Sequence, residues 1–316
     1  MAELAGMLVG DYFLLECLAR EGQVAMYRAR PTTRGGYDVL LRLFKPPFPD
    51  PTNFRNHFAT EVEKVWHCHH EHLLPLFEFG TGDDLLYCVT RFPEMETVSQ
   101  FLKQQPERFV PVERVVSLAV QLCDAVQYLH SRGIVHGNIQ PSSIYLRDGQ
   151  DVLLTNHGMR RAYQEGEPLA SLLDEGNAFY VAPEQSLGMV CPASDIYALG
   201  VLLYRLLGGL FPYDGGSAEE IIWQRTNNPL PSLYRLRPDM PYAVEEVLQK
   251  SLAKLPIHRF ASAYEFAQAL LTAVTGAYTQ DATTQEPRRV QVRSCRTQFS
   301  RNHAESLLAL PHPQCQ

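Results

Sequence analysis

The segment His136-Gly137-Asn138-Ile139-Gln140-Pro141-Ser142-Ser143 gathers an imidazole, two amides and two hydroxyls in a short stretch of chain. Side chains of these types exchange hydrogen bonds, but an amide has no useful basicity, so Asn138 cannot take a proton from a substrate. A second polar segment, Asn156-His157-Gly158, follows eighteen residues after Asn138. The Asn156 amide lacks the negative charge that hard cations such as Mg²⁺ require. The two segments therefore favour hydrogen bonding over acid–base or metal chemistry.

The hydrophobic pattern of the sequence predicts the strands and helices that must position these residues. Apolar and polar residues alternate in short runs over residues 12–44, which predicts three strands and their turns. A helical pattern covers about 53–68, and a strand pair ends near Phe92. Apolar residues then recur at helical spacing over 112–129. Further helices are predicted over residues 194–207, 217–226, 242–252 and 262–274. A β-rich first third followed by helices predicts two unequal lobes that share a cleft.

Two later segments complete a recognisable order of motifs. They are Ala182-Pro183-Glu184 and Asp195-Ile196-Tyr197-Ala198-Leu199-Gly200. Together with the two polar segments, their order and spacing resemble the eukaryotic-like (Hanks-type) bacterial Ser/Thr protein kinases. The resemblance implies an α+β, bilobal protein-kinase-like fold, with a small β-rich N-lobe that carries one regulatory helix and a larger helical C-lobe.

The resemblance also divides the chain into segments. The kinase-like domain would cover residues 11–275, with the N-lobe at about 11–92 and the C-lobe at about 93–275. Residues 1–10 would form an N-terminal extension. Residues 276–316, where helical periodicity stops and Thr, Gln, Arg and Pro are frequent, are predicted to be a disordered tail.

Four positions to which the resemblance assigns phosphoryl-transfer chemistry hold atypical residues. Transfer from ATP requires an aspartate near the attacking hydroxyl and ligands for one or two Mg²⁺ ions. The proton-accepting aspartate is Asn138 here, and the aspartate of the family's D-F-G motif is Asn156. The lysine that follows the catalytic aspartate is Gln140, and the metal-binding asparagine is Ser143. We therefore expect no intact catalytic residue, no metal and no bound cofactor.

The positions that would hold a nucleotide are also altered. The strand lysine that pairs with ATP phosphates is Arg42, which keeps the charge and could pair with Glu61 of the regulatory helix. Larger residues replace the three glycines of the phosphate-covering loop and the slim residues that line the adenine pocket. The loop positions are Ala19, Glu21 and Val24, and the pocket positions are Met26, Leu40 and Tyr145. These side chains are predicted to obstruct a purine nucleotide.

Positions that the resemblance assigns to architecture match the family well. Glu184 is expected to pair with Arg259 beneath the activation segment. Asp195 corresponds to the helix aspartate that hydrogen-bonds the backbone of the catalytic loop, and His136 to the histidine that packs beneath the cleft. These residues are predicted to be structural.

Residues 67–72, His-Cys-His-His-Glu-His, have the composition of a zinc site. Their spacing is too dense for tetrahedral zinc ligation from one element, so ordinary packing is the favoured interpretation and no metal site is predicted. Asp124, on the long predicted helix, has no catalytic partner in view.

Composition limits the cellular location and the classes of partner that we expect. A net charge of −7 argues against a general nucleic-acid or anionic-membrane surface. Seven scattered cysteines without a C-x-x-C motif indicate reduced thiols, and the N-terminus lacks the basic start of a signal peptide. We therefore expect a cytoplasmic protein with protein partners, no nucleic acid and no membrane span.

These observations leave three functions open. The favoured one is a catalytically impaired kinase-like protein, a pseudokinase, that acts as a signalling scaffold or binding module. The second is an active or atypical Ser/Thr protein kinase that transfers phosphate from Mg-ATP to protein. The third is a non-catalytic switch that binds ATP.

Overall fold

The structure is a computed structural model that describes residues 4–21, 24–33, 36–44, 51–81, 85–104, 109–155 and 178–281. The chain divides into a compact unit, Met1–Tyr278, and a second unit, Thr279–Gln316. In the part of the chain described, no helix is both long and apolar enough to cross a lipid bilayer.

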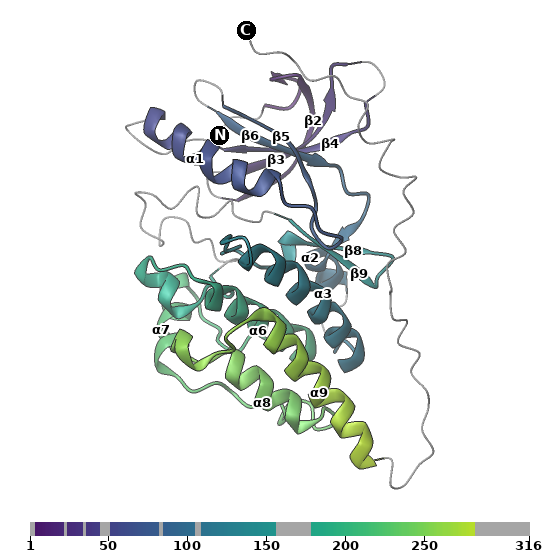
Figure 1. The fold of residues 1–316 in the computed structure, drawn as a ribbon, viewed down its shortest axis with the longest axis vertical. Helices are drawn as coiled ribbons and strands as arrows, with labels where there is room; N and C mark the ends of the chain where they lie inside the picture. Colours follow the sequence, from purple (N-terminus) through teal and green to yellow (C-terminus); the bar gives the residue numbers. More distant parts are fainter. Residues whose placement is uncertain are drawn as a thin grey trace. The chain divides into compact units, whose positions relative to one another are not determined.

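An antiparallel sheet builds the first lobe, with the strand order β1-β2-β3-β4-β6-β5 (Figure 1). Side chains alternate between its faces, so Ala25, Tyr27 and Ala29 of β3 are buried while the residues between them are half-buried. All of β4 is buried, because it lies inside the sheet between β3 and β6. The strands are β1 (Leu8–Val9), β2 (Tyr12–Glu21), β3 (Val24–Pro31), β4 (Val39–Phe44), β5 (Leu76–Thr81) and β6 (Leu86–Arg91).

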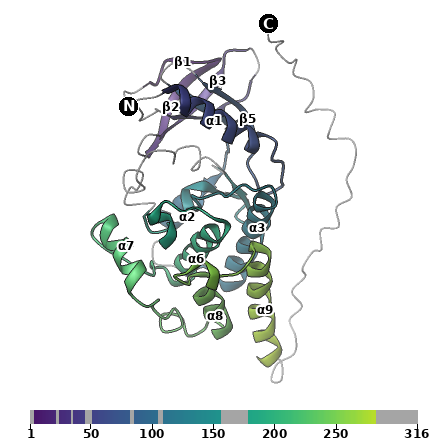
Figure 2. The same ribbon diagram turned by 60° about the vertical axis from the view of Figure 1, so that its left-hand side comes forward.

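Helix α1 (Pro51–Trp66) lies alongside this sheet, as Figures 1 and 2 both show. Its buried residues Phe58, Val62 and Val65 recur every three to four positions, which is the spacing of one helix face. The Phe58 ring packs 5.4 Å from the ring of Phe44. The sheet and α1 therefore share one apolar core.

The second lobe is helical, with a small three-stranded sheet, β7-β8-β9. Its centre is α6, on which nearly every residue is buried. Gly200 of α6 permits close packing, since a β-carbon there would lie 2.4 Å from the Ser251 hydroxyl. The elements are β7 (Glu96–Thr97), α2 (Val98–Gln104), α3 (Val112–His130), β8 (Ile144–Arg147), β9 (Asp151–Leu154), α6 (Pro192–Gly208), α7 (Ala218–Asn227), α8 (Tyr242–Ser251) and α9 (Ala263–Asp281), with 3₁₀ turns at Pro141–Ser143, Pro183–Leu187 and Pro256–His258.

The predicted fold class is confirmed: the chain is α+β, with a β-rich lobe that carries one helix and a larger helical lobe. Two elements lie wholly or partly outside the domain bounds predicted at residues 11–275. Leu8–Val9, assigned to an N-terminal extension, forms β1 because it pairs with β2. Helix α9 runs to Asp281 and so crosses the boundary predicted at residue 276. Residues 282–316 of the predicted tail lie outside the described residues.

Candidate functional site: a kinase-like catalytic loop

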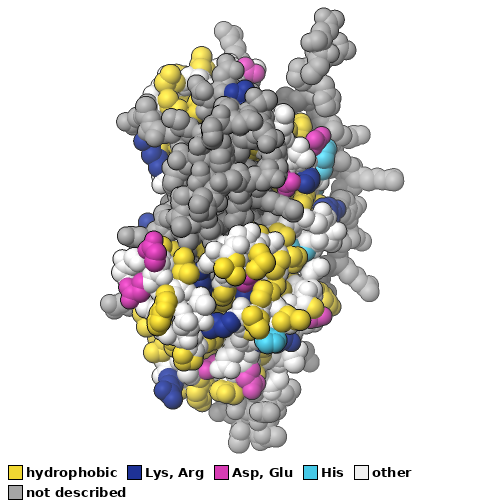
Figure 3. Space-filling view, turned by 90° about the vertical axis from the view of Figure 1, so that its left-hand side faces the viewer, with side chains coloured by type: hydrophobic (Ala, Val, Ile, Leu, Met, Phe, Trp, Pro, Cys, Tyr) yellow, Lys and Arg dark blue, Asp and Glu magenta, His cyan; other side chains and the backbone are white. Residues whose placement is uncertain are grey.

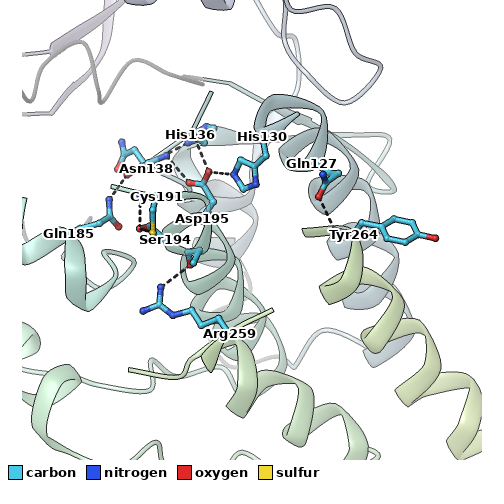
Figure 4. Close-up of polar contacts among 12 residues, drawn as sticks. Gln127, His130, His136, Asn138, Gln185, Cys191, Ser194, Asp195, Arg259 and Tyr264 are labelled. Atoms are coloured by element: carbon cyan, nitrogen blue, oxygen red, sulfur yellow. Dashed lines mark hydrogen bonds and ion pairs between the residues drawn. The ribbon is translucent and has the colours of Figure 1, made fainter. Parts of the chain in front are cut away.

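Asp195 organises the loop that carries Asn138 (Figure 4). Its carboxylate accepts hydrogen bonds from the backbone N–H groups of His136, at 2.9 Å, and Gly137, at 2.7 Å. The Nε2 atom of His130, from α3, lies 2.8 Å from the same carboxylate. Because Asp195 is buried on α6, these contacts tie the loop to the centre of the helical lobe. The bonds from Asp195 therefore hold the backbone of the loop in one conformation.

The bonds around the His136 ring define its protonation. The backbone N–H of Asn138 donates to Nδ1 at 3.2 Å, so Nδ1 carries a lone pair. Nε2 lies 2.8 Å from the carbonyl oxygen of Thr155, which only accepts, so Nε2 carries the proton. Burial lowers the pKa of His136, in agreement with a neutral ring. His136 thus joins the loop to the end of β9 as a structural residue.

Other polar residues of the loop form hydrogen bonds with the backbone of the loop itself. The Ser143 hydroxyl donates to the Gln140 carbonyl at 2.8 Å and accepts from the Gln140 N–H at 3.1 Å. Both residues are buried. Asn138 is half-buried between them and Gly137, where its side chain presents an amide. Asn156 lies outside the described residues. The described part of the loop offers hydrogen-bond donors and acceptors but no carboxylate.

Arg42 reaches from β4 across to the end of β9. Its side chain is buried, and its Nη2 donates to the Thr155 hydroxyl at 3.1 Å. Glu61, with which Arg42 could pair, forms an ion pair with Lys64 at 2.5 Å on its own helix. The long guanidinium extends to the hydroxyl of Thr155, and Lys64 lies one turn along α1 from Glu61. A buried cation thus links β4 of the first lobe to the end of β9 in the second.

The remaining predicted nucleotide positions lie on the first sheet and on β8. Leu40 is fully buried in β4, and Met26 and Tyr145 are half-buried. Ala19 and Val24, on β2 and β3, are also half-buried. Glu21 ends β2, and its side chain lies outside the described residues.

Glu184 and Arg259 form a buried bidentate ion pair. Nη1 and Nη2 of Arg259 each lie 2.7 Å from one carboxylate oxygen of Glu184. The Ser194 hydroxyl donates to the same carboxylate at 2.7 Å. Burial alone raises the pKa of Glu184, but the bonds from Arg259 and Ser194 outweigh it and hold the pKa below its ordinary value. The pair fastens the 3₁₀ turn at 183–187 to the end of the 3₁₀ turn at 256–258, and the Ser194 bond fastens it to α6.

The sequence and fold of this chain have counterparts among known proteins. The model of the protein kinase domain matches residues 48–272, more than half of the chain. The chain belongs to the protein kinase family. Its bacterial relatives place it with the Hanks-type Ser/Thr kinases, as the motifs predicted.

Kinases of known name align with most of this chain. Serine/threonine-protein kinase PrkC of Bacillus subtilis is 26% identical over 265 residues, which cover 84% of this chain and 40% of PrkC. Serine/threonine-protein kinase PknD of Mycobacterium tuberculosis is 29% identical over 281 residues, covering 88% of this chain and 42% of PknD. The chain therefore spans about two fifths of the length of these relatives.

Solved kinase structures share the fold. The Mycobacterium tuberculosis PknI kinase domain superposes with a TM-score of 0.69 at 25% identity, covering 87% of this chain and 100% of that domain. The bilobal kinase fold is therefore shown by the superposition as well as by the order of elements.

Several residues of this kinase-family loop were not singled out from the sequence. Thr155 receives the Arg42 bond, and Gln185 links the loop to the 183–187 turn by donating to the Gly137 carbonyl at 3.0 Å. His130 contacts Asp195 from the last turn of α3. Only Gln185 carries a local signal, because it directly follows the Ala182-Pro183-Glu184 motif.

Proposed function

We propose that this kinase-family chain is a pseudokinase, which keeps the fold as a binding module and does not transfer phosphate by the family's usual chemistry. The observation that carries the proposal is the contrast within one loop. Asp195 and His136 hold its backbone as an active loop requires, yet the residue at the position of the base is Asn138. An amide in that position cannot accept the proton of an attacking hydroxyl.

The nucleotide side of the cleft supports the same proposal. The match to the kinase domain begins at residue 48, after β4, so the altered loop positions and Arg42 lie outside the matched span. The guanidinium of Arg42 is engaged by Thr155 and is no substitute for a lysine point charge on a phosphate. Leu40 adds a branched side chain where the family has a small one.

A second candidate is an active Ser/Thr protein kinase, and the names of the relatives favour it. PrkC and PknD are both named serine/threonine-protein kinases, and each aligns over more than four fifths of this chain. Under this candidate Arg42 would hold phosphate, and an acid other than residue 138 would take the proton. The names of the relatives support the active kinase, whereas the chemistry of this chain's own residues supports the pseudokinase.

Thermal denaturation with ATP separates the candidates. A ligand that binds the native state raises the melting temperature once its concentration exceeds the dissociation constant. We expect no shift with ATP alone or with Mg²⁺ or Mn²⁺, and no radiolabel transferred from ATP to the chain or to a general protein substrate. A shift without metal would favour the ATP-binding switch. A metal-dependent shift with transfer that is lost in Arg42→Ala would establish the active kinase instead.

The helical lobe presents an apolar surface suited to a protein partner. Figure 3 shows hydrophobic side chains gathered on the face that carries α7. Three segments meet there, and buried Arg225 joins two of them by donating to the Ala178 carbonyl and the Ser186 hydroxyl. Lys254 joins the third through the Arg225 carbonyl. The exposed apolar residues on these segments, here called the α7 patch, are Leu187, Met189, Trp223, Leu255 and Ile257.

Substitutions in the α7 patch are expected to abolish partner binding without unfolding the chain. Trp223 and Ile257 are 60% and 86% exposed, so aspartate at both positions removes contact area at little cost to the core. The measurement is recovery of co-purifying protein by the natural chain and by Trp223→Asp/Ile257→Asp. The matched control is Tyr264→Asp, an exposed aromatic on α9. Equal recovery by all three chains would place the partner surface elsewhere.

A further inference from the structure

A cluster of ligand-type side chains lies where the connection from α1 to β5 meets α3. Glu71 and His72 come from the connection and Asp124 from α3. The carboxylate oxygens and the imidazole nitrogen of these three residues all lie within 4.8 Å of one another. The three residues of the cluster have no part in the proposed function.

A contact outside the cluster orients His72 as a ligand. Its Nδ1 lies 3.1 Å from the carbonyl oxygen of Val152, which only accepts, so Nδ1 carries the ring proton. Nε2 then has its lone pair available and lies 3.8 Å from the Glu71 carboxylate. Histidines that bind metals almost always donate their other ring N–H to a carbonyl or carboxylate in this way. The side chain is mostly covered, with 16% exposed, so its orientation is fixed by packing as well.

His70 orients the second carboxylate. The backbone N–H of His72 donates to His70 Nδ1 at 3.2 Å, so the ring proton of neutral His70 lies on Nε2. That Nε2 lies 3.3 Å from Asp124 and donates to it. His70 therefore acts as a positioning residue for Asp124 and not as a ligand itself.

We propose that Glu71, His72 and Asp124 bind one divalent first-row transition-metal ion, with Zn²⁺ as the representative case. One imidazole and two carboxylates suit Zn²⁺, which takes nitrogen and oxygen ligands and is commonly held by three protein groups plus water. The histidine-rich segment alone is too dense for tetrahedral ligation. The third ligand comes from another element, more than fifty residues later, and sequence spacing could not reveal it.

Binding would fasten the connection after α1 to helix α3. The ion would add to the links already made there by the His72–Val152 contact and by the exchange of backbone hydrogen bonds between residues 72–74 and Leu154. By mass action, an ion that binds only the folded chain raises its melting temperature. The site would thus act as a clamp between the α1–β5 connection and the helical lobe.

Calorimetric titration of the tag-free, chelator-treated full chain with Zn²⁺ tests the site. We expect one equivalent to bind and the melting temperature to rise. Glu71→Gln and Asp124→Asn are expected to weaken binding by about tenfold or more. Both side chains are mostly exposed, at 74% and 60%, so these variants should fold normally. His72→Gln should abolish binding, and His70→Gln should weaken it while one equivalent still binds.

Two control variants test whether a loss of Zn²⁺ binding is specific to the residues of the cluster. Asp151→Asn removes one negative charge from the neighbouring β9 without touching the cluster, and His67→Gln removes an exposed imidazole that stacks on Trp66. Both are expected to bind Zn²⁺ as the natural chain does. The proposal would be overturned if binding is not saturable, or if either control loses as much affinity as Asp124→Asn. It would also be overturned if binding is lost only on replacing His303 and His312, the two histidines of residues 282–316.

Discussion

Replacement of Arg259 by alanine is expected to lower the free energy of unfolding by about 3–5 kcal/mol. The change removes both 2.7 Å bonds to Glu184 and leaves a buried carboxylate with only the Ser194 hydroxyl as a side-chain donor. Arg259 also donates to the carbonyls of Ala193 and Ala253, and the same change removes both of these bonds. Domains are typically stable by only about 5–15 kcal/mol, so a large fall in the denaturation midpoint is expected. Chemical denaturation of the purified chain measures it.

The pH dependence of this loss identifies the stranded carboxylate as its cause. In the natural chain the pKa of Glu184 is depressed below 4.5, so its contribution to stability is full above that pH and is lost on acidification through the lower value. Without Arg259, burial raises the pKa of Glu184 above its unfolded value. The variant then loses stability as the pH rises. The deficit relative to the natural chain should therefore be smaller at about pH 5 than at about pH 8.

Arg237 provides the matched control for this experiment. Its side chain is also buried and donates to the carbonyls of Val110 and Leu207, but its carboxylate neighbour Asp239 is mostly exposed. Arg237→Ala should therefore destabilise the chain by an amount that changes little with pH. An Arg259→Ala chain with natural stability, or with the same deficit at both pH values, would mean that Glu184 does not depend on this ion pair.

The fold was largely predictable because its strongest signals are local. The apolar spacing of α3 and α6 follows from burial of one face or of the whole helix, and the Asp195 and Glu184 motifs lie in continuous stretches of chain. Two-residue strands such as β7 carry no periodic pattern, and α2 is too short for a clear one. These elements were absent from the sequence prediction.

The candidate site was less predictable, since its decisive contacts join residues far apart in the chain. Arg42 and Thr155 are separated by 113 residues, and their contact depends on the reach of a guanidinium from one strand to the end of another. The cluster of Glu71, His72 and Asp124 likewise depends on how α3 passes the α1–β5 connection. Residue types alone showed which groups were present, but packing decided which of them meet.

Restoration of both family carboxylates, Asn138→Asp with Asn156→Asp, is expected to leave phosphate transfer near background. A general base contributes about 10²–10⁴-fold to a rate, but only if the nucleotide is bound in reach. Arg42 would still extend to Thr155, and the buried side chain of Leu40 would remain on the same face of β4 as Arg42. The measurement is radiolabel transfer from Mg-ATP by the double variant, together with its melting temperature in Mg-ATP.

The informative comparison adds Leu40→Ala and Arg42→Lys to the double variant. If an obstructed nucleotide pocket is the reason for inactivity, Mg-ATP should raise the melting temperature of the quadruple variant. It should not raise the melting temperature of the double variant. Because Leu40 is buried, its truncation costs stability, and each chain is therefore compared with itself without ATP. A Mg-ATP shift already present in the double variant would show that the nucleotide enters past Leu40 and Arg42, and that the two missing carboxylates alone account for the loss of catalysis.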